Sequence, residues 1–125
     1  MKEISKLILI GVLSAIFSNV YAGNIYYFYC MHITADTSRA YFSPVRTVNK
    51  SRDDINITEL GRQFSLSINK PGKTSCYGYD SDKVGDDDEA IEGREKGIKF
   101  LKNKGLVVSN SDMQSFSDYV KILND

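Results

Sequence analysis

Two cysteines and a single histidine are the residues of this 125-residue chain with the most evident chemistry. Cys30 and His32 are two positions apart, so on a strand their side chains share a face, and a cysteine–histidine nucleophile is geometrically possible. Cys30 and Cys76 can instead form a disulfide, which is the expected state in an oxidising compartment. We predict a Cys30–Cys76 disulfide, a structural role for His32 and no catalytic residue.

The two cysteines also limit which kinds of site are possible. A single His excludes any site with two or three His ligands, and two Cys cannot form a four-Cys zinc site. A disulfide between residues this far apart in the chain would stabilise a small domain by about 4 kcal/mol through lost chain entropy. Such a contribution is a large share of the roughly 5–15 kcal/mol that keeps a domain folded.

An acidic loop over residues 80–89 is the sharpest local feature of the sequence. It is not an EF-hand, because counting from Asp80 puts Val84 at the fifth position and Ile91 at the twelfth. Three interpretations remain: an acidic start to the following helix, an irregular calcium site, or a contact patch for a basic partner. We predict no metal and no cofactor. The candidate partner-contact residues are Tyr77, Tyr79, Asp80, Asp82, Asp86, Asp87 and Asp88.

Composition narrows the class of partner. The chain has 16 Lys+Arg and 16 Asp+Glu, so a strongly basic nucleic-acid binder is excluded. The chain has eight tyrosines and six phenylalanines. We expect about half of those in the exported domain to fill a small core, and the rest, where exposed, provide good protein-binding patches. No basic residues alternate with these aromatics, which argues against single-stranded nucleic acid as a ligand. A protein is the partner that the composition favours.

The N-terminal segment has the three parts of a secretory signal peptide. Lys2 and Lys6 precede the uncharged run Leu7–Phe17, and Val20 and Ala22 are small residues at the expected cleavage positions. The apolar run is too short to span a bilayer. We therefore predict that residues 1–22 are a signal peptide and that residues 23–125 form one exported domain. Its location would be periplasmic or secreted, with no stable membrane insertion after cleavage.

The rest of the chain predicts a small α+β domain in the order β-β-α-β-α-β. An unbroken apolar run predicts a strand covered on both faces, and Pro44 predicts an interruption or an edge in the next strand. Asn56 and Glu59 favour a helix over residues 56–69, although alternating residues around Leu66 also fit a strand. We expect one sheet with helices on one face and the disulfide between adjacent strands. The expected strands are 25–33, 39–48, 74–79 and 106–108, the second helix is 90–104, and the tail 112–125 is either a helix or a strand.

This layout resembles a group of small exported bacterial proteins that carry one disulfide, among them immunity proteins against type VI secretion effectors. The features that carry the resemblance are Cys30 in an aromatic strand, Tyr41-Phe42-Ser43-Pro44-Val45, Phe64 ahead of Cys76, and a helix leading into Gly105-Leu106-Val107-Val108. The resemblance implies a compact periplasmic α+β domain that binds another protein. No residue role is carried over from it.

Three classes of function follow from these observations. The first is a periplasmic inhibitor or immunity protein that occludes a partner effector enzyme and is not itself an enzyme. The alternative is a secreted enzyme or toxin that uses His32 or the aspartates of the acidic loop, or an envelope structural or stress protein without a single partner.

Overall fold

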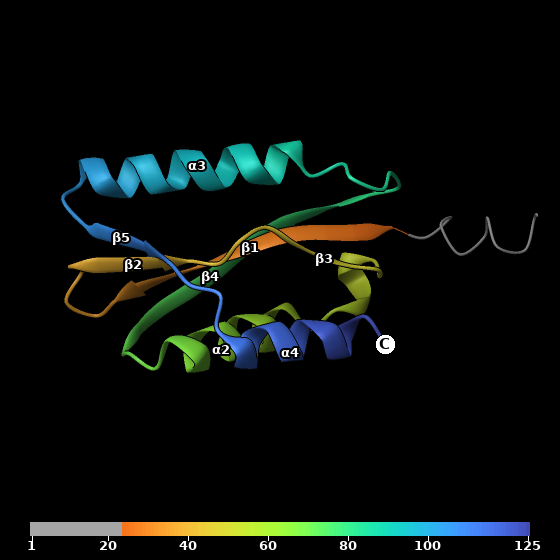
Figure 1. Ribbon diagram of the computed structural model, residues 1–125, viewed down its shortest axis with the longest axis horizontal. Helices are drawn as coiled ribbons and strands as arrows, with labels where there is room; N and C mark the ends of the chain where they lie inside the picture. The colour runs from red at the N-terminus through yellow and green to blue at the C-terminus, as the bar shows by residue number, and fades with distance from the viewer. Residues whose placement is uncertain (1–23) are drawn as a thin grey trace, which may run out of the picture.

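A computed structural model describes residues 24–125 (Figure 1). The predicted signal peptide, residues 1–22, lies outside the described residues. None of the helices in the described part has the length and apolar character needed to cross a membrane. The strands are β1 (Ile25–Thr34), β2 (Arg39–Phe42), β3 (Arg46–Val48), β4 (Gly72–Ser81) and β5 (Val107–Asn110). The helices are the 3-10 turn η1 (Arg52–Asp54), α2 (Ile57–Ile68), α3 (Asp88–Asn103) and α4 (Gln114–Leu123).

β1 is the central strand of a five-stranded sheet. On one side it pairs antiparallel with β4 along its whole length, and on the other side with β2 and β3 in succession. Ser43, Pro44 and Val45 separate β2 from β3, so the interruption predicted at Pro44 is confirmed. β5 adds to β2 in parallel and forms a short outer edge. The predicted α+β class, single domain and approximate element order are confirmed.

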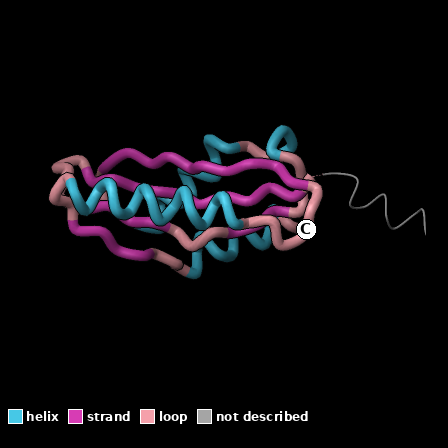
Figure 2. Tube along the Cα trace, turned by 90° about the horizontal axis from the view of Figure 1, so that it is seen from above, coloured by secondary structure: helices cyan, strands magenta, loops and turns pink. Residues whose placement is uncertain are grey.

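The helices cover both faces of the sheet, and the expectation that they share one face is wrong. α3 lies on one face, and α2 and α4 lie on the other (Figures 1 and 2). The pairing makes β3, β4 and β5 parallel to one another, so α2 and α3 are both crossovers between parallel strands. These crossovers traverse the sheet in opposite directions, and a shared right-handed sense therefore puts them on opposite faces.

β1 is almost continuously buried because both of its faces are covered. Tyr26, Phe28 and Cys30 pack toward α2 and α4, together with Phe64 and Phe116. Tyr29 packs on the opposite side, under α3. The sequence predicts this strand correctly, because an apolar run without alternation is typical of a strand buried on both faces.

The boundaries of α2 follow from local capping residues. Asn56 accepts a hydrogen bond from the Glu59 N–H at 3.0 Å, so the predicted helical start is confirmed and the strand alternative is wrong. α2 ends at Asn69, which has a left-handed backbone with φ of 58°. The predicted buried strand at 106–108 is β5, which begins at Val107 and is half-exposed at the sheet edge. The tail is a helix, α4.

The turn between β1 and β2 contains a carboxylate, that of Asp36, whose pKa is unusually low. Asp36 Oδ1 accepts hydrogen bonds from the Ser38 hydroxyl at 2.7 Å, the Thr34 hydroxyl at 2.7 Å and the Ser38 N–H at 3.0 Å. The Ser38 side chain is the largest of the influences that lower the pKa of Asp36 from its ordinary 3.8 to about 2.

We expect the Asp36 carboxyl to titrate at about pH 2 in an NMR titration. Ser38→Ala should move this pKa up toward 3.8, whereas Ser117→Ala, a matched change on α4, should leave it unchanged. Because the folded pKa is depressed, the turn's contribution to stability is present above the unfolded pKa of about 4 and is lost as the pH falls toward 2. A carboxyl that titrates near 3.8 in the folded wild type would contradict this prediction.

Candidate functional site

The acidic loop between β4 and α3 is held in one conformation by a buried tyrosine. The Tyr27 hydroxyl donates to the Lys83 carbonyl at 2.6 Å and accepts from the N–H groups of Gly85 and Asp86 at 2.8 and 3.3 Å. Tyr27 is buried in β1, far from the loop in sequence. Gly85 takes a left-handed backbone with φ of 82°, which glycine adopts without strain. The loop is therefore a preformed structure fastened to the sheet.

A second tyrosine fastens the other end of the loop. The Tyr79 hydroxyl donates to the Asp86 carbonyl at 2.8 Å and accepts from the Ala90 N–H at the start of α3 at 3.3 Å. Partial burial raises the pKa of Tyr79, and the Asp86 and Glu89 carboxylates raise it further. The hydroxyl therefore keeps its proton at neutral pH and can continue to donate. Tyr79 thus supports the acidic loop through its hydroxyl.

The predicted aspartates fall into two groups. Asp80 accepts hydrogen bonds from the Arg52 N–H at 2.8 Å and the Ser51 hydroxyl at 3.3 Å, and Asp86 accepts one from the Ser81 hydroxyl at 2.6 Å. Both of these carboxylates hold local structure. The remaining three make no side-chain hydrogen bond or ion pair within residues 24–125. These are Asp82, Asp87 and Asp88. The first is exposed directly after β4, the second is half-buried immediately before α3, and the third is the exposed first residue of α3.

Tyr77 is separate from this group. It lies in the middle of β4, its ring packs on Tyr29 with centroids 5.5 Å apart, and 47% of the residue is exposed. The sequence places Tyr77 and Tyr79 together as contact residues. In the structure, only Tyr79 of these two tyrosines hydrogen-bonds the acidic loop.

Comparisons with known proteins give no assignment. The chain matches no protein-family model, no curated protein and no solved structure. The geometry of the described residues is therefore the basis for inferring a function.

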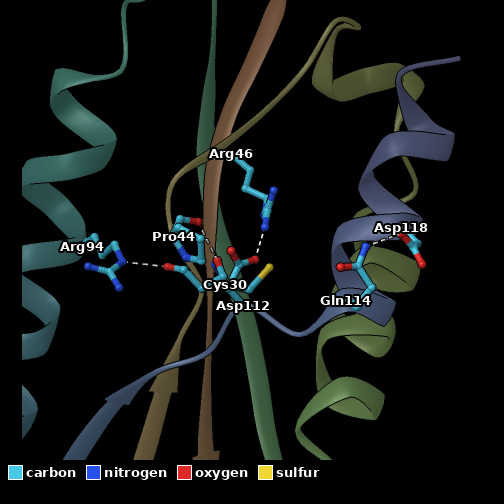
Figure 3. Close-up of polar contacts among 8 residues, drawn as sticks. Cys30, Pro44, Arg46, Arg94, Asp112, Gln114 and Asp118 are labelled. Carbon is cyan, nitrogen blue, oxygen red and sulfur yellow. Dashed lines mark hydrogen bonds and ion pairs between the residues drawn. The ribbon is translucent and has the colours of Figure 1, made fainter.

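A groove along α3 adjoins the acidic loop and was not predicted from the sequence. It has a volume of about 520 Å³ and lies where β2 breaks before β3 and where the chain leaves β5. Arg94 on α3 donates to the Ser43 carbonyl at 2.7 Å, and Arg46 pairs with Asp112 (Figure 3). Burial lowers the pKa of Arg94. The residues that line the groove are Pro44, Val45, Asp87, Ile91, Arg94, Glu95, Asn110 and Asp112.

Cys30 and His32 do not form the cysteine–histidine nucleophile that their spacing allows. Cys30 is bonded to Cys76, so it has no thiol, and the predicted disulfide is confirmed. His32 is fully buried with Nδ1 2.7 Å from the Thr74 hydroxyl oxygen, and Ser43, also buried, donates its hydroxyl to Pro44. None of these side chains is open to a substrate. Within residues 24–125, no three His, Cys, Asp or Glu side chains lie close enough together to hold a metal ion.

The role of Tyr27 can be tested through stability. Tyr27→Phe removes the acceptor of two loop N–H groups and the donor to Lys83, which we expect to cost about 1–3 kcal/mol of the free energy of unfolding. Tyr41→Phe is the matched control, because Tyr41 makes no side-chain hydrogen bond to a described residue. Urea unfolding measures both variants. Equal, small effects of the two changes would contradict the anchoring role of Tyr27.

Proposed function

We propose that this protein is a small exported binding protein, an inhibitor or immunity protein that occludes a secreted effector enzyme. Its contact surface is the acidic loop together with the α3 groove. The observation that carries this proposal is the loop fixed by Tyr27 and Tyr79, because it presents three carboxylates that form no ion pair within residues 24–125.

Like charges gathered in one loop repel one another, and a basic partner relieves that repulsion on binding. A preformed loop also loses little conformational entropy when the partner docks, which favours affinity. The groove beside Asp87 extends the surface along α3. Its walls carry Glu95 and Arg94, and also Asp112, which Arg46 pairs with. The disulfide supports the exported location, because such bonds persist in oxidising compartments.

A charge-reversal pair tests this surface. In pull-downs from periplasmic and secreted fractions of the source bacterium, Asp82→Lys/Asp88→Lys should weaken capture of the partner at least about tenfold. Asp118→Lys/Asp125→Lys makes the same change in net charge at α4 and the C-terminal end, and should capture it as the wild type does. Capture should also fall as salt rises from about 0.05 to 0.5 M. Equal capture by both variants would overturn the surface.

The immunity role has its own test. Cells that lack the gene should be killed by sibling cells that deliver the effector, and the wild-type gene should restore survival. Full survival of the deletion strain against every sibling-delivered effector would refute that role, while the binding surface would still be judged by the pull-down.

A further inference from the structure

β4 leaves a long edge of the sheet open. It pairs with β1 over all ten of its residues and with no other described strand. Cys30 and Cys76 are register partners with Cα atoms 4.0 Å apart, the short spacing of a pair that exchanges no backbone hydrogen bonds. Hydrogen-bonded and non-hydrogen-bonded pairs alternate along an antiparallel ladder. Ala35 and Pro71, five positions beyond the cysteines in the same register, are a hydrogen-bonded pair, because the Ala35 N–H donates to the Pro71 carbonyl at 2.9 Å. Between Lys73 and Ser81, the backbone N–H and C=O groups that point away from β1 are therefore those of Thr74, Cys76, Gly78 and Asp80.

This edge lacks the features that usually keep edge strands from pairing. Proteins protect edges with charges, prolines, bulges or very short strands. β4 is long and keeps an unbroken register, and between Lys73 and Asp80 it contains neither a charge nor a proline. None of its outward backbone N–H groups donates a hydrogen bond within residues 24–125. The opposite edge of the sheet, β5, has only four residues.

A groove runs beside this open edge on the α2 face of the sheet. Its volume is about 670 Å³, and its α2 side is lined by Ile57, Thr58, Gly61, Arg62 and Ser65. The charge of Arg62 is paired with Glu59 on the same helix. The β4 side is lined by residues 74–77. On the other face of the strand, Tyr77 presents a half-exposed ring. A strand added to β4 would therefore have a place for its side chains on each face.

The occupant that fits is a single extended segment and not a second copy of this chain. Ile57 and Thr58, the first residues of α2, line the groove together with Tyr77, so α2 begins against the middle of the edge. Two copies paired antiparallel about Tyr77 would bring both α2 N-termini to the same place. A single segment meets no such obstacle.

The charges along the edge define the segment further. Asp80 and Asp82 of the acidic loop lie at one end, where Arg52 contacts Asp80 through its backbone N–H and Asp82 is left without an ion pair to a described residue, and Lys73 lies at the other end. The segment therefore needs a cationic side chain at the Asp80 end and no cation at the Lys73 end. Apolar side chains of modest size suit the groove beside Gly61 and Ser65.

We infer that β4 accepts an extended segment of a partner protein as a sixth, antiparallel strand, with a Lys or Arg near its N-terminal end beside Asp80 and Asp82. Backbone hydrogen bonds supply affinity in such strand addition, and alternate side chains supply specificity. The inference rests on the proposed binding function and adds to it the mode of contact.

Amide hydrogen exchange with a peptide probe tests this inference. The probe is the blocked heptapeptide Lys-Val-Thr-Val-Thr-Val-Thr, added to the full exported protein at about 1 mM. We expect exchange at the amides of Thr74, Cys76, Gly78 and Asp80 to slow at least about fivefold, while Ser75 and Tyr77, already bonded to β1, do not change. The reversed peptide, Thr-Val-Thr-Val-Thr-Val-Lys, places its cation by Lys73 and should protect these amides at least about threefold less.

Variants connect this protection to the groove. Ser65→Leu fills the groove and should reduce the protection by the probe, whereas Ser115→Leu on α4 should not. The inference is overturned if the probe leaves the four amides unchanged, or if they are already protected in the free protein by self-association. Amide protection together with partner capture that is unchanged by Asp82→Lys/Asp88→Lys would support strand addition at the edge, but it would refute both the acidic surface and the cation placed beside Asp82. The reverse pattern would refute the edge alone.

Discussion

Replacing Cys30 and Cys76 together by alanine will lower the free energy of unfolding by about 4 kcal/mol, because the unfolded chain regains the entropy of a long open loop. The bridge joins residues separated by 46 positions and contains β2, β3, η1 and α2 within its loop. Such a loss is a large part of a small domain's stability, so we also expect aggregation or proteolysis of the variant at body temperature.

Urea unfolding at neutral pH measures the effect of the disulfide. Wild-type protein treated with a reductant is the control, and it should lose a similar amount without any change of sequence. A loss below about 1 kcal/mol in both samples would show that the bridge adds little to a fold that is already stable.

Gly78→Ala will destabilise the protein by about 3 kcal/mol, at the upper end of the effect of overpacking. A Cβ atom at this position would lie 2.3 Å from the Tyr27 carbonyl oxygen and 2.7 Å from the Phe28 Cβ. Both neighbours belong to the central strand, so neither can move without disturbing the core.

Gly61→Ala is the matched control for Gly78→Ala, and its expected effect has the opposite sign. In α2, the added Cβ would meet Thr74 and Cys76 at 3.8 and 3.9 Å, which is ordinary contact. Alanine should then stabilise the helix by about 0.5–1 kcal/mol over glycine. Two substitutions with the same chemistry should thus shift the urea midpoint in opposite directions, and shifts in the same direction would contradict the packing described for β4.

Local signals in the sequence predict most of the elements, but not their arrangement around the sheet. Asn56 and Glu59 identify the start of α2, and the apolar run around Phe28 identifies a strand buried on both faces. That run already required cover on two faces, and the expectation of helices on one face contradicts it. The assignment of α3 to its own face depends on the directions of β3, β4 and β5, which result from long-range pairing.

The sequence predicts the candidate site only as a cluster of acidic residues, and it indicates neither the residue that fixes their loop nor the adjoining groove. The aspartates of residues 80–89 are visible in the sequence, but the residue that fixes their loop, Tyr27, is 56 to 59 positions away from its partners. One signal was present, because a tyrosine in a buried strand needs a partner for its hydroxyl. The α3 groove depends on where Arg94 meets Ser43, and no local pattern indicates that contact.

The position of the disulfide within β4 limits local unfolding of this strand. Edge strands are commonly among the first parts of a sheet to open in local unfolding. Cys76 is midway along β4 and is covalently joined to the central strand, so fraying from either end stops after a few residues. The outward amides of Thr74 and Gly78, on either side of the bridge, therefore stay in place during such openings. The bridge thus keeps this edge strand in a constant geometry toward solvent.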